Sequence, residues 1–407
     1  MIKRKPFKFI VLIVCIFMLV LFPSSIGRPN QAETKGVVIA MGIDKVDNQF
    51  EVSLQMIQPA QGLSYTDNLI ITTHKGPTIS QAIDLIGLNV GKEVGFAHCK
   101  VLVLGDSACQ DNVIDLVDFF LRTGLLGSSM SVINTDKNAK DLLEASSQGI
   151  NKQVNSVQFI MDFNKQYVHA TEVHLNTLLT DYLSPTQVSL MSTLSIKEEE
   201  KGETNVGAGG SEAGDGAGGQ MSESQPKELL NEGKTSVFKA GKKIGVLSED
   251  EIRGRNWILN KTTKGNTQVD HINSEHFSDA SVVAALVSKN LSYVCNIVQN
   301  KPIITYDLNI NMRIVETEQD SNRVLFDSNE TYFDNELKAK LEDAIKAQVQ
   351  AAATFAKDNN ADIADFYNKF NITNTKGWKK YLDSLGSQDD YLKEIVVVAN
   401  VKVNGRM

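Results

Sequence analysis

The stretch "SVFKAGKKIGVLSEDEIRGRNWI", residues 236–258, carries the local signals of a β-hairpin followed by a helix. Strand-forming residues at 237–239 and 244–247 flank the turn-prone pair Ala240 and Gly241, which predicts two antiparallel strands. Ser248 stands three residues before Glu251, the spacing of a capping box, so a helix should begin there. Gly254 is expected to end that helix in the left-handed conformation.

The residues that follow extend this part of the chain to its end. Residues 285–317 alternate apolar and polar side chains and predict two long antiparallel strands. Residues 334–370 contain no Gly or Pro and predict one long helix, and residues 394–403 predict a last strand. The apolar face of the helix consists of Leu337, Leu341, Ile345, Val349 and Ala352.

Residues 35–196 form an earlier part of mixed composition. Runs at 37–43 and 50–57 flank Asp47 and Asn48 and predict a hairpin. Helices and strands then alternate in the order β-β-α-β-α-β-α, and a helix, a break at Ser184 and Pro185 and a strand close this part. The fold class we expect is α+β, with mixed or antiparallel sheets and packed helices in two to three domains. A third domain would need a further break near residue 150.

Residues 197–228 separate the two parts. They are rich in Gly, Ser and Glu and contain no aromatic residue. Such a composition buries too little apolar surface to offset the entropy of ordering, so we expect a flexible linker here. The C-terminal domain would then comprise residues 229–407.

The N-terminus predicts export. A basic tip, "MIKRKPFK", precedes an unbroken apolar run from Phe9 to Phe22. This pattern is typical of a signal peptide, and with the next few residues the run could also serve as a membrane anchor. We favour an uncleaved anchor within residues 1–34, because no good small-residue cleavage site follows. Cys15 lies in the middle of the run, which argues against a lipid attached there.

Composition excludes some functions. The formal net charge is −8, which argues against a nucleic-acid partner, since phosphate backbones are bound mainly by clustered Lys and Arg. Beyond the leader, Cys99, Cys109 and Cys295 cannot form a disulfide framework. A bond between Cys99 and Cys109 is conceivable, but separate buried thiols are the expected state.

Residues with reactive side chains do not form a catalytic pattern. In "GFAHCKVLVLG" strand alternation would place His98 and Lys100 on one face and Cys99 on the other, so they make no nucleophilic cluster. The histidine pairs 169/174 and 271/276 are five residues apart, which does not match the spacing of four in HExxH zinc motifs. We expect no catalytic site, no cofactor and no metal.

Several motifs, taken in their shared order, resemble the Ger(x)C family, the C subunits of spore-germination nutrient receptors. The most specific is the opening stretch, which is similar to the family's C-terminal signature. "GVVIAMGIDK", "GFAHCKVLVLGD" with its His98, and "LLTDYLSPTQVSL" are similar to segments of its N-terminal part. The signature residues are Phe238, Lys239, Gly245, Leu247, Glu251, Arg253, Gly254 and Trp257. All of them except Leu247, together with His98, are also candidate interaction residues.

The resemblance implies a non-catalytic subunit on the outer face of the inner spore membrane. There it would assemble with two multi-span membrane subunits, A and B, that respond to a nutrient. Two departures from the family stand out: no Cys suits lipid attachment, and "TGLLGSS" replaces an Asn-Pro-acidic stretch.

Two other functions stay open. An exported ligand-binding module could capture a small molecule between the two parts, with the glycine-rich linker as a hinge. An exported cell-wall enzyme is the third hypothesis, and it predicts an apolar pocket with converging carboxylates.

Overall fold

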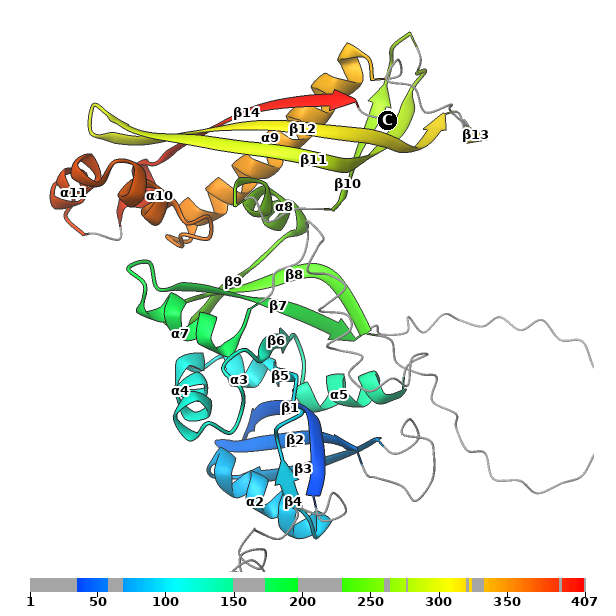
Figure 1. Ribbon diagram of the computed structural model, residues 1–407, viewed down its shortest axis with the longest axis vertical. Coiled ribbons are helices and arrows are strands. Elements are labelled where there is room, and N and C mark those ends of the chain that lie inside the picture. Colours follow the sequence, from blue (N-terminus) through cyan, green and yellow to red (C-terminus); the bar gives the residue numbers. More distant parts are fainter. Residues whose placement is uncertain are drawn as a thin grey trace, which may run out of the picture.

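The computed structural model describes residues 35–57, 69–148, 173–196, 229–259, 264–275, 277–319, 322–323, 333–387 and 390–405. The expected anchor at 1–34 and the expected linker at 197–228 lie outside these residues. The described chain is an α+β fold with two sheets, one above the other along the long axis (Figure 1). None of the helices in the described part combines the length and apolar character that a membrane crossing requires.

The first sheet is mixed and runs in the order β3-β2-β1-β5-β6-β7-β8-β9, with β4 also paired to β1. β1, β5, β6 and β7 are parallel neighbours, whereas both edges of the sheet are antiparallel. The strands are β1 (Lys35–Val46), β2 (Gln49–Ile57), β3 (Leu69–Gly76), β4 (Glu93–Gly95), β5 (Val101–Leu104), β6 (Ser131–Thr135), β7 (Val188–Ile196), β8 (Leu229–Lys239) and β9 (Lys242–Leu247).

Helices cover both faces of this sheet. α2 (Ile79–Val90), α4 (Val113–Thr123) and α7 (Leu175–Leu183) pack with the short α3 (Asp106–Cys109) on one face, and α5 (Ala139–Gln148) packs on the other. The predicted β1–β2 hairpin is confirmed, because Asp47 and Asn48 both have positive φ, as a tight two-residue turn requires. β3 was missed by the sequence patterns, although its Ile and Thr residues are good strand formers.

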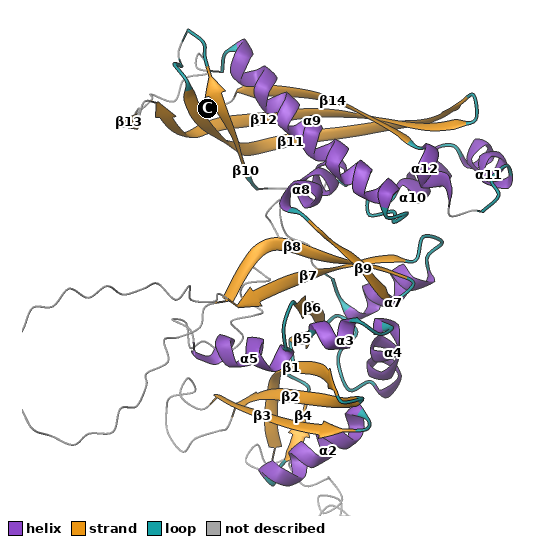
Figure 2. Ribbon diagram, turned by 180° about the vertical axis from the view of Figure 1, so that it is seen from behind, coloured by secondary structure: helices purple, strands orange, loops and turns teal. Residues whose placement is uncertain are grey.

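The second sheet has the order β10-β11-β12-β13, and β14 pairs with β12 in parallel. α9 lies across one face of it (Figures 1 and 2). The strands are β10 (Asn266–Ile272), β11 (Ala280–Val298), β12 (Lys301–Gln319), β13 (Asn322–Arg323) and β14 (Val396–Gly405). The helices are α8 (Glu249–Ile258), α9 (Asn335–Asp358), α10 (Phe366–Thr373), α11 (Thr375–Asp383) and α12 (Tyr391–Glu394).

The long strands and the apolar face of the long helix are confirmed, but the helix is shorter than expected. α9 ends at Asp358, and Asn360 and Asp365 then adopt positive φ. Asn tolerates this conformation better than most residues, so the chain turns there and starts α10.

The hairpin of β8 and β9 contributes residues to the hydrophobic cores of both sheets. It follows the glycine-rich segment in sequence, yet β8 pairs with β7 and so extends the first sheet. Phe238 packs into the core beneath α4, whereas its neighbour Val237 packs into the core of the second sheet. Adjacent strand residues point to opposite faces, so this part of the sheet has a hydrophobic core on either side.

Candidate functional site at the junction of the two sheets

The carboxyl ends of the parallel strands are the first place to look for a site, since open α/β sheets bind ligands there. Three carboxylates lie at this edge. Asp44 comes just after the residues of β1 that pair with β5, Asp106 begins the helix after β5, and Asp136 follows β6 directly. Each of them makes contacts with the protein itself.

Asp44 caps a helix that is distant in sequence. It is fully buried, and its carboxylate accepts the N–H groups of Ala139 (2.8 Å) and Lys140 (3.2 Å) at the start of α5. Burial raises the pKa of Asp44 above its usual value, although the two backbone donors partly oppose this rise. Gly105 leaves room for the carboxylate, because a Cβ there would lie 1.7 Å from Asp44 Oδ1.

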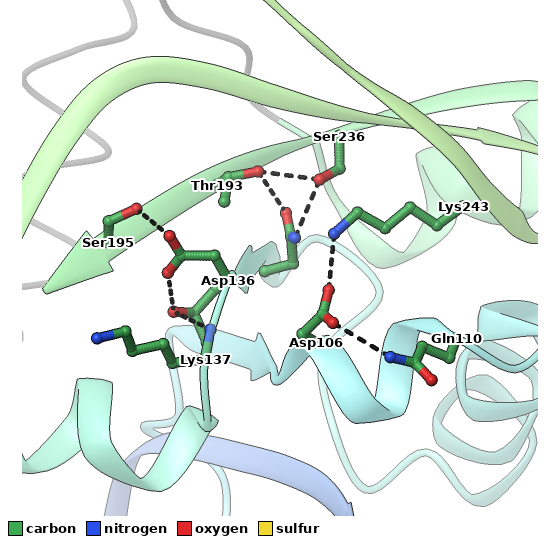
Figure 3. Close-up of polar contacts among 10 residues, drawn as sticks. Asp106, Gln110, Asp136, Lys137, Thr193, Ser195, Ser236 and Lys243 are labelled. Atoms are coloured by element: carbon green, nitrogen blue, oxygen red, sulfur yellow. Dashed lines mark hydrogen bonds and ion pairs between the residues drawn. The ribbon is translucent and has the colours of Figure 1, made fainter.

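Asp106 and Asp136 are engaged as well (Figure 3). Asp106 accepts from Lys243 Nζ of β9 (2.8 Å) and from Gln110 (3.3 Å). Burial tends to raise the pKa of Asp106, but the hydrogen bond and charge of Lys243 outweigh it, so the pKa is lowered. Asp136 accepts from Ser195 Oγ at 2.9 Å.

Between these carboxylates lies a closed triangle of buried polar side chains from β6, β7 and β8 (Figure 3). Thr193 Oγ1 donates to Asn134 Oδ1 (2.9 Å), Asn134 Nδ2 donates to Ser236 Oγ (3.1 Å), and the two hydroxyls lie 3.0 Å apart. Within the described ranges, no group of three or more His, Cys, Asp or Glu side chains could hold a metal ion. The contacts of Ser236 and Lys243 join the β8–β9 hairpin to the strands and helix that precede it in sequence.

The turn of the hairpin is fitted against α4. Gly241 has a φ of +79°, and its carbonyl accepts the N–H of Val113 at 2.9 Å. A Cβ on Gly241 would lie 1.8 Å from Oδ1 of Asn112, the residue that caps α4. Only glycine satisfies both the backbone conformation and this close approach.

Three signature residues on the hairpin contact the elements of the second sheet. Lys239 Nζ donates to the carbonyl of Asn360 just after α9 (2.7 Å). A Cβ on Gly245 would lie 3.3 Å from Cζ of Phe355, so glycine lets β9 approach α9. Leu247 is fully buried in the core of the second sheet.

The predicted capping box is present at the start of α8. Ser248 accepts the N–H of Glu251, and the Glu251 carboxylate accepts the N–H of Ser248. Arg253 then bonds Glu249 (2.9 Å) and the carbonyl of Asn266 on β10 (2.8 Å). The signature residues Glu251 and Arg253 therefore stabilise α8, and Arg253 also connects it to the second sheet.

The prediction for Gly254 is wrong. Gly254 lies inside α8, which continues to Ile258, and does not end it. A Cβ at Gly254 would lie 1.8 Å from the carbonyl oxygen of Gln348, so the residue is the point where α8 and α9 cross. Close packing of two backbones, rather than a left-handed cap, explains the glycine.

Trp257 of α8 also contacts α9 where the two helices cross. Its indole Nε1 donates to Gln348 Oε1 at 2.9 Å, while Gln348 Nε2 donates to Asp250 at 3.2 Å. The Lys289 ammonium lies 5.3 Å from the centre of the indole ring, and burial lowers the pKa of Lys289 to about 8.

Arg255 lies between the signature residues Gly254 and Trp257, and no sequence pattern predicted its role. Its guanidinium is buried and donates to the carbonyl of Ile363 at 2.7 Å, and burial lowers its pKa to about 10. Nearby Asp362 accepts from the backbone of Phe366 (2.8 Å) and Tyr367 (2.7 Å) and from Tyr391 Oη (2.7 Å). The charged pattern Arg-Gly-Arg gave no signal that separates a buried arginine from an exposed one.

His98 and Cys99 do not make a site. The expected continuous strand is wrong here: β4 ends at Gly95, β5 begins at Val101, and His98 lies exposed in the turn between them. Cys99 is buried, and burial raises its pKa to about 12, so the thiol is not activated. Cys99, Cys109 and Cys295 are separate buried thiols, as expected. Of the histidine pairs 169/174 and 271/276, His169 and His276 lie outside the described residues.

Two family models match the chain on either side of residues 197–228. "Spore germination protein N-terminal domain" matches residues 30–196, and "Spore germination B3/GerAC like, C-terminal" matches residues 233–406. The chain belongs to the GerAC-like family of spore germination proteins. The signature residues thus lie within the part of the chain that the C-terminal family model matches.

One curated relative and one solved structure are similar to this chain. The chain is 23% identical over 239 residues to spore germination protein KC of Bacillus subtilis (strain 168), covering 55% of this chain and 56% of that protein. The match thus spans about half the length of this curated relative. The crystal structure of the GerBC protein superimposes with a TM-score of 0.54 over 90% of this chain and 97% of that one. At 14% identity this likeness shows a shared fold.

Proposed function

We propose that this chain is the non-catalytic C-type subunit of a germinant receptor, acting by contact with two multi-span membrane subunits. The observation that carries the proposal is the ordered match of both family models to the two halves of the chain. The apolar run from Phe9 to Phe22 would hold it on the outer face of the inner spore membrane.

The geometry of the junction supports a role in contact rather than in chemistry. Asp44, Asp106 and Asp136 have protein partners. The pairing of β7 with β8 and the bond from Lys239 of β8 to the Asn360 carbonyl after α9 connect the two parts of the molecule. A body joined in this way can pass a displacement at one end to the other. The domains we propose are residues 35–196 and 229–407, and the β8–β9 hairpin at the start of the second domain pairs with β7 of the first.

The proposal is tested by purification from spore membranes. The full chain with a C-terminal affinity tag should be recovered in the membrane fraction together with both multi-span subunits. A variant in which residues 9–22 are replaced by a polar sequence should be lost from that fraction. Recovery of the intact chain free of membranes, or saturable binding of a nutrient to the chain without the membrane subunits, would refute the proposal.

A further inference from the structure

A surface groove lies at the end of the molecule opposite the second sheet. It has a volume of about 880 Å³ and is formed by the end of α2, by β4 and by the loop after α4. Its apolar lining includes Phe96, a buried residue of the core of the first sheet, and Ile83, Val94 and Leu125, which pack against that core. In both views, α2 and β4 form the tip furthest from β11 and β12 (Figures 1 and 2).

The rim of the groove carries an unusual exposed side chain. Leu88, on the last turns of α2, is 79% exposed, and Leu85 on the same helix is 39% exposed. A single exposed leucine is ordinary, but here it stands beside a hollow with an apolar floor. Exposed apolar surface at the rim of a binding groove marks an interaction site more often than an isolated exposed leucine does.

The groove lies close to the point where the described chain begins. Glu93 and Val94 of β4 pair with Lys35 and Gly36, where the described chain begins. Phe22, the last residue of the apolar run, is 13 residues before Lys35. A fully extended chain spans at most about 3.6 Å per residue, so the groove lies within roughly 50 Å of that run.

The charges at the rim favour a protein over a lipid surface. Asp84 and Glu93 place two carboxylates at the groove against the one ammonium of Lys92. Anionic headgroups would be repelled by this excess of negative charge, and a hollow receives side chains better than a flat bilayer surface does.

We infer that this groove receives an apolar segment of a multi-span membrane subunit of the receptor, with Leu88 as the central contact. The inference rests on the proposed function and adds to it the surface through which the partner is held. The occupant is a protein segment with aliphatic or aromatic side chains that emerges at the outer face of the membrane.

A matched pair of variants in the full chain tests the inference. Leu183, the last residue of α7, is 72% exposed and does not line the groove, so Leu183→Gln is the control for Leu88→Gln. In spore membranes, Leu88→Gln should reduce the amount of membrane subunit that co-purifies by about tenfold, because a buried amide would be left without a partner. Leu183→Gln should leave recovery unchanged.

The outcomes separate this inference from the proposed function. If the unaltered chain does not recover the membrane subunits, the proposed function fails. If it does, and Leu88→Gln recovers them equally well or both variants lose them, the inference alone is wrong.

Crosslinking gives a second measurement that does not depend on weakening the contact. A photoreactive phenylalanine analogue placed at position 88 should form an adduct with a membrane subunit, whereas the same group at position 183 should not. An adduct of the chain with itself, an adduct with lipid, or equal adducts from both positions would overturn the inference.

Discussion

Lys369 shows how much a single residue depends on its surroundings. It is buried on α10, where its ammonium donates to the carbonyl of Ala364 at 2.5 Å. The ammonium also lies 5.4 Å from the ring centre of Tyr306 and 5.8 Å from that of Tyr293. Burial lowers the pKa of Lys369 to about 8, although the nearby carboxylates of Asp362 and Asp365 oppose this.

This shift predicts a pH dependence of stability. Between pH 8 and 10.5, the ordinary pKa of lysine, the Lys369 side chain is mostly deprotonated in the folded protein and mostly protonated in the unfolded chain. The unfolded state binds more protons, so the free energy of unfolding contributed by Lys369 rises with pH in that window and is flat below it. The gain by pH 10 should be on the order of 2 kcal/mol.

Denaturant unfolding of the full chain at several pH values checks the prediction. The free energy of unfolding of the unaltered protein, minus that of Lys369→Met, should rise between pH 8 and pH 10, since other titrating groups are common to both. Lys379→Met, on the exposed face of α11, is the control and should leave the slope unchanged. Equal slopes in the unaltered protein and in Lys369→Met would contradict the assignment.

At the scale of elements, the crossing of α8 and α9 is the contact that the signature most clearly serves. Gly254 lets the two backbones meet, and the Trp257 indole bonds Gln348 one turn further along α8. The capping box at Ser248 and Glu251 sets where α8 begins. The start of the helix follows from neighbours in sequence, whereas its packing depends on a helix almost a hundred residues later.

Adding one carbon at this crossing should therefore destabilise the protein. In Gly254→Ala the Cβ would lie 2.4 Å from the carbonyl carbon of Gln348 and 2.9 Å from Val349 N, so α8 and α9 must separate. We expect a loss of about 2–3 kcal/mol in the free energy of unfolding, the usual cost of overpacking. Denaturant unfolding of the full chain measures it.

Gly127 offers the matched control. A Cβ there would meet nothing within 4 Å, so Gly127→Ala should change stability by less than about 0.5 kcal/mol. If Gly254→Ala were as stable as Gly127→Ala, the close approach of the two helices would not exist in the native protein.

At the scale of the whole molecule, the two halves share a sheet. β7 and β8 pair from Val188 with Lys239 to Ile196 with Leu229, across the glycine-rich segment. The hairpin then reaches both cores, through Phe238 on one side and Val237 on the other. A chain built in this way does not need residues 197–228 to keep its halves together.

Cutting the chain in that segment should accordingly leave the molecule whole. A protease site inserted near residue 212, cleaved after folding, should yield two fragments that elute together on gel filtration without denaturant. The same cleaved protein in 6–8 M urea should separate into its fragments, which serves as the control. Separation under native conditions would show that the pairing of β7 with β8 does not hold the halves.

The sequence alone determined the features that depend on neighbouring residues. The β1–β2 turn, the turn at Ala240 and Gly241, the capping box of α8 and the apolar face of α9 were all predicted, because each depends on residues a few positions apart. The family followed from the order of such motifs.

Only the tertiary structure decided what those residues contact. The role of Gly254, the burial of Arg255, the capping of α5 by Asp44 and the groove beside Leu88 depend on segments distant in sequence. Backbone propensity and side-chain spacing act over one or two turns, whereas packing brings together residues that no local pattern relates. In this protein, residues close in sequence therefore define where helices and strands begin and end. The packing of elements distant in sequence determines what the signature residues contact.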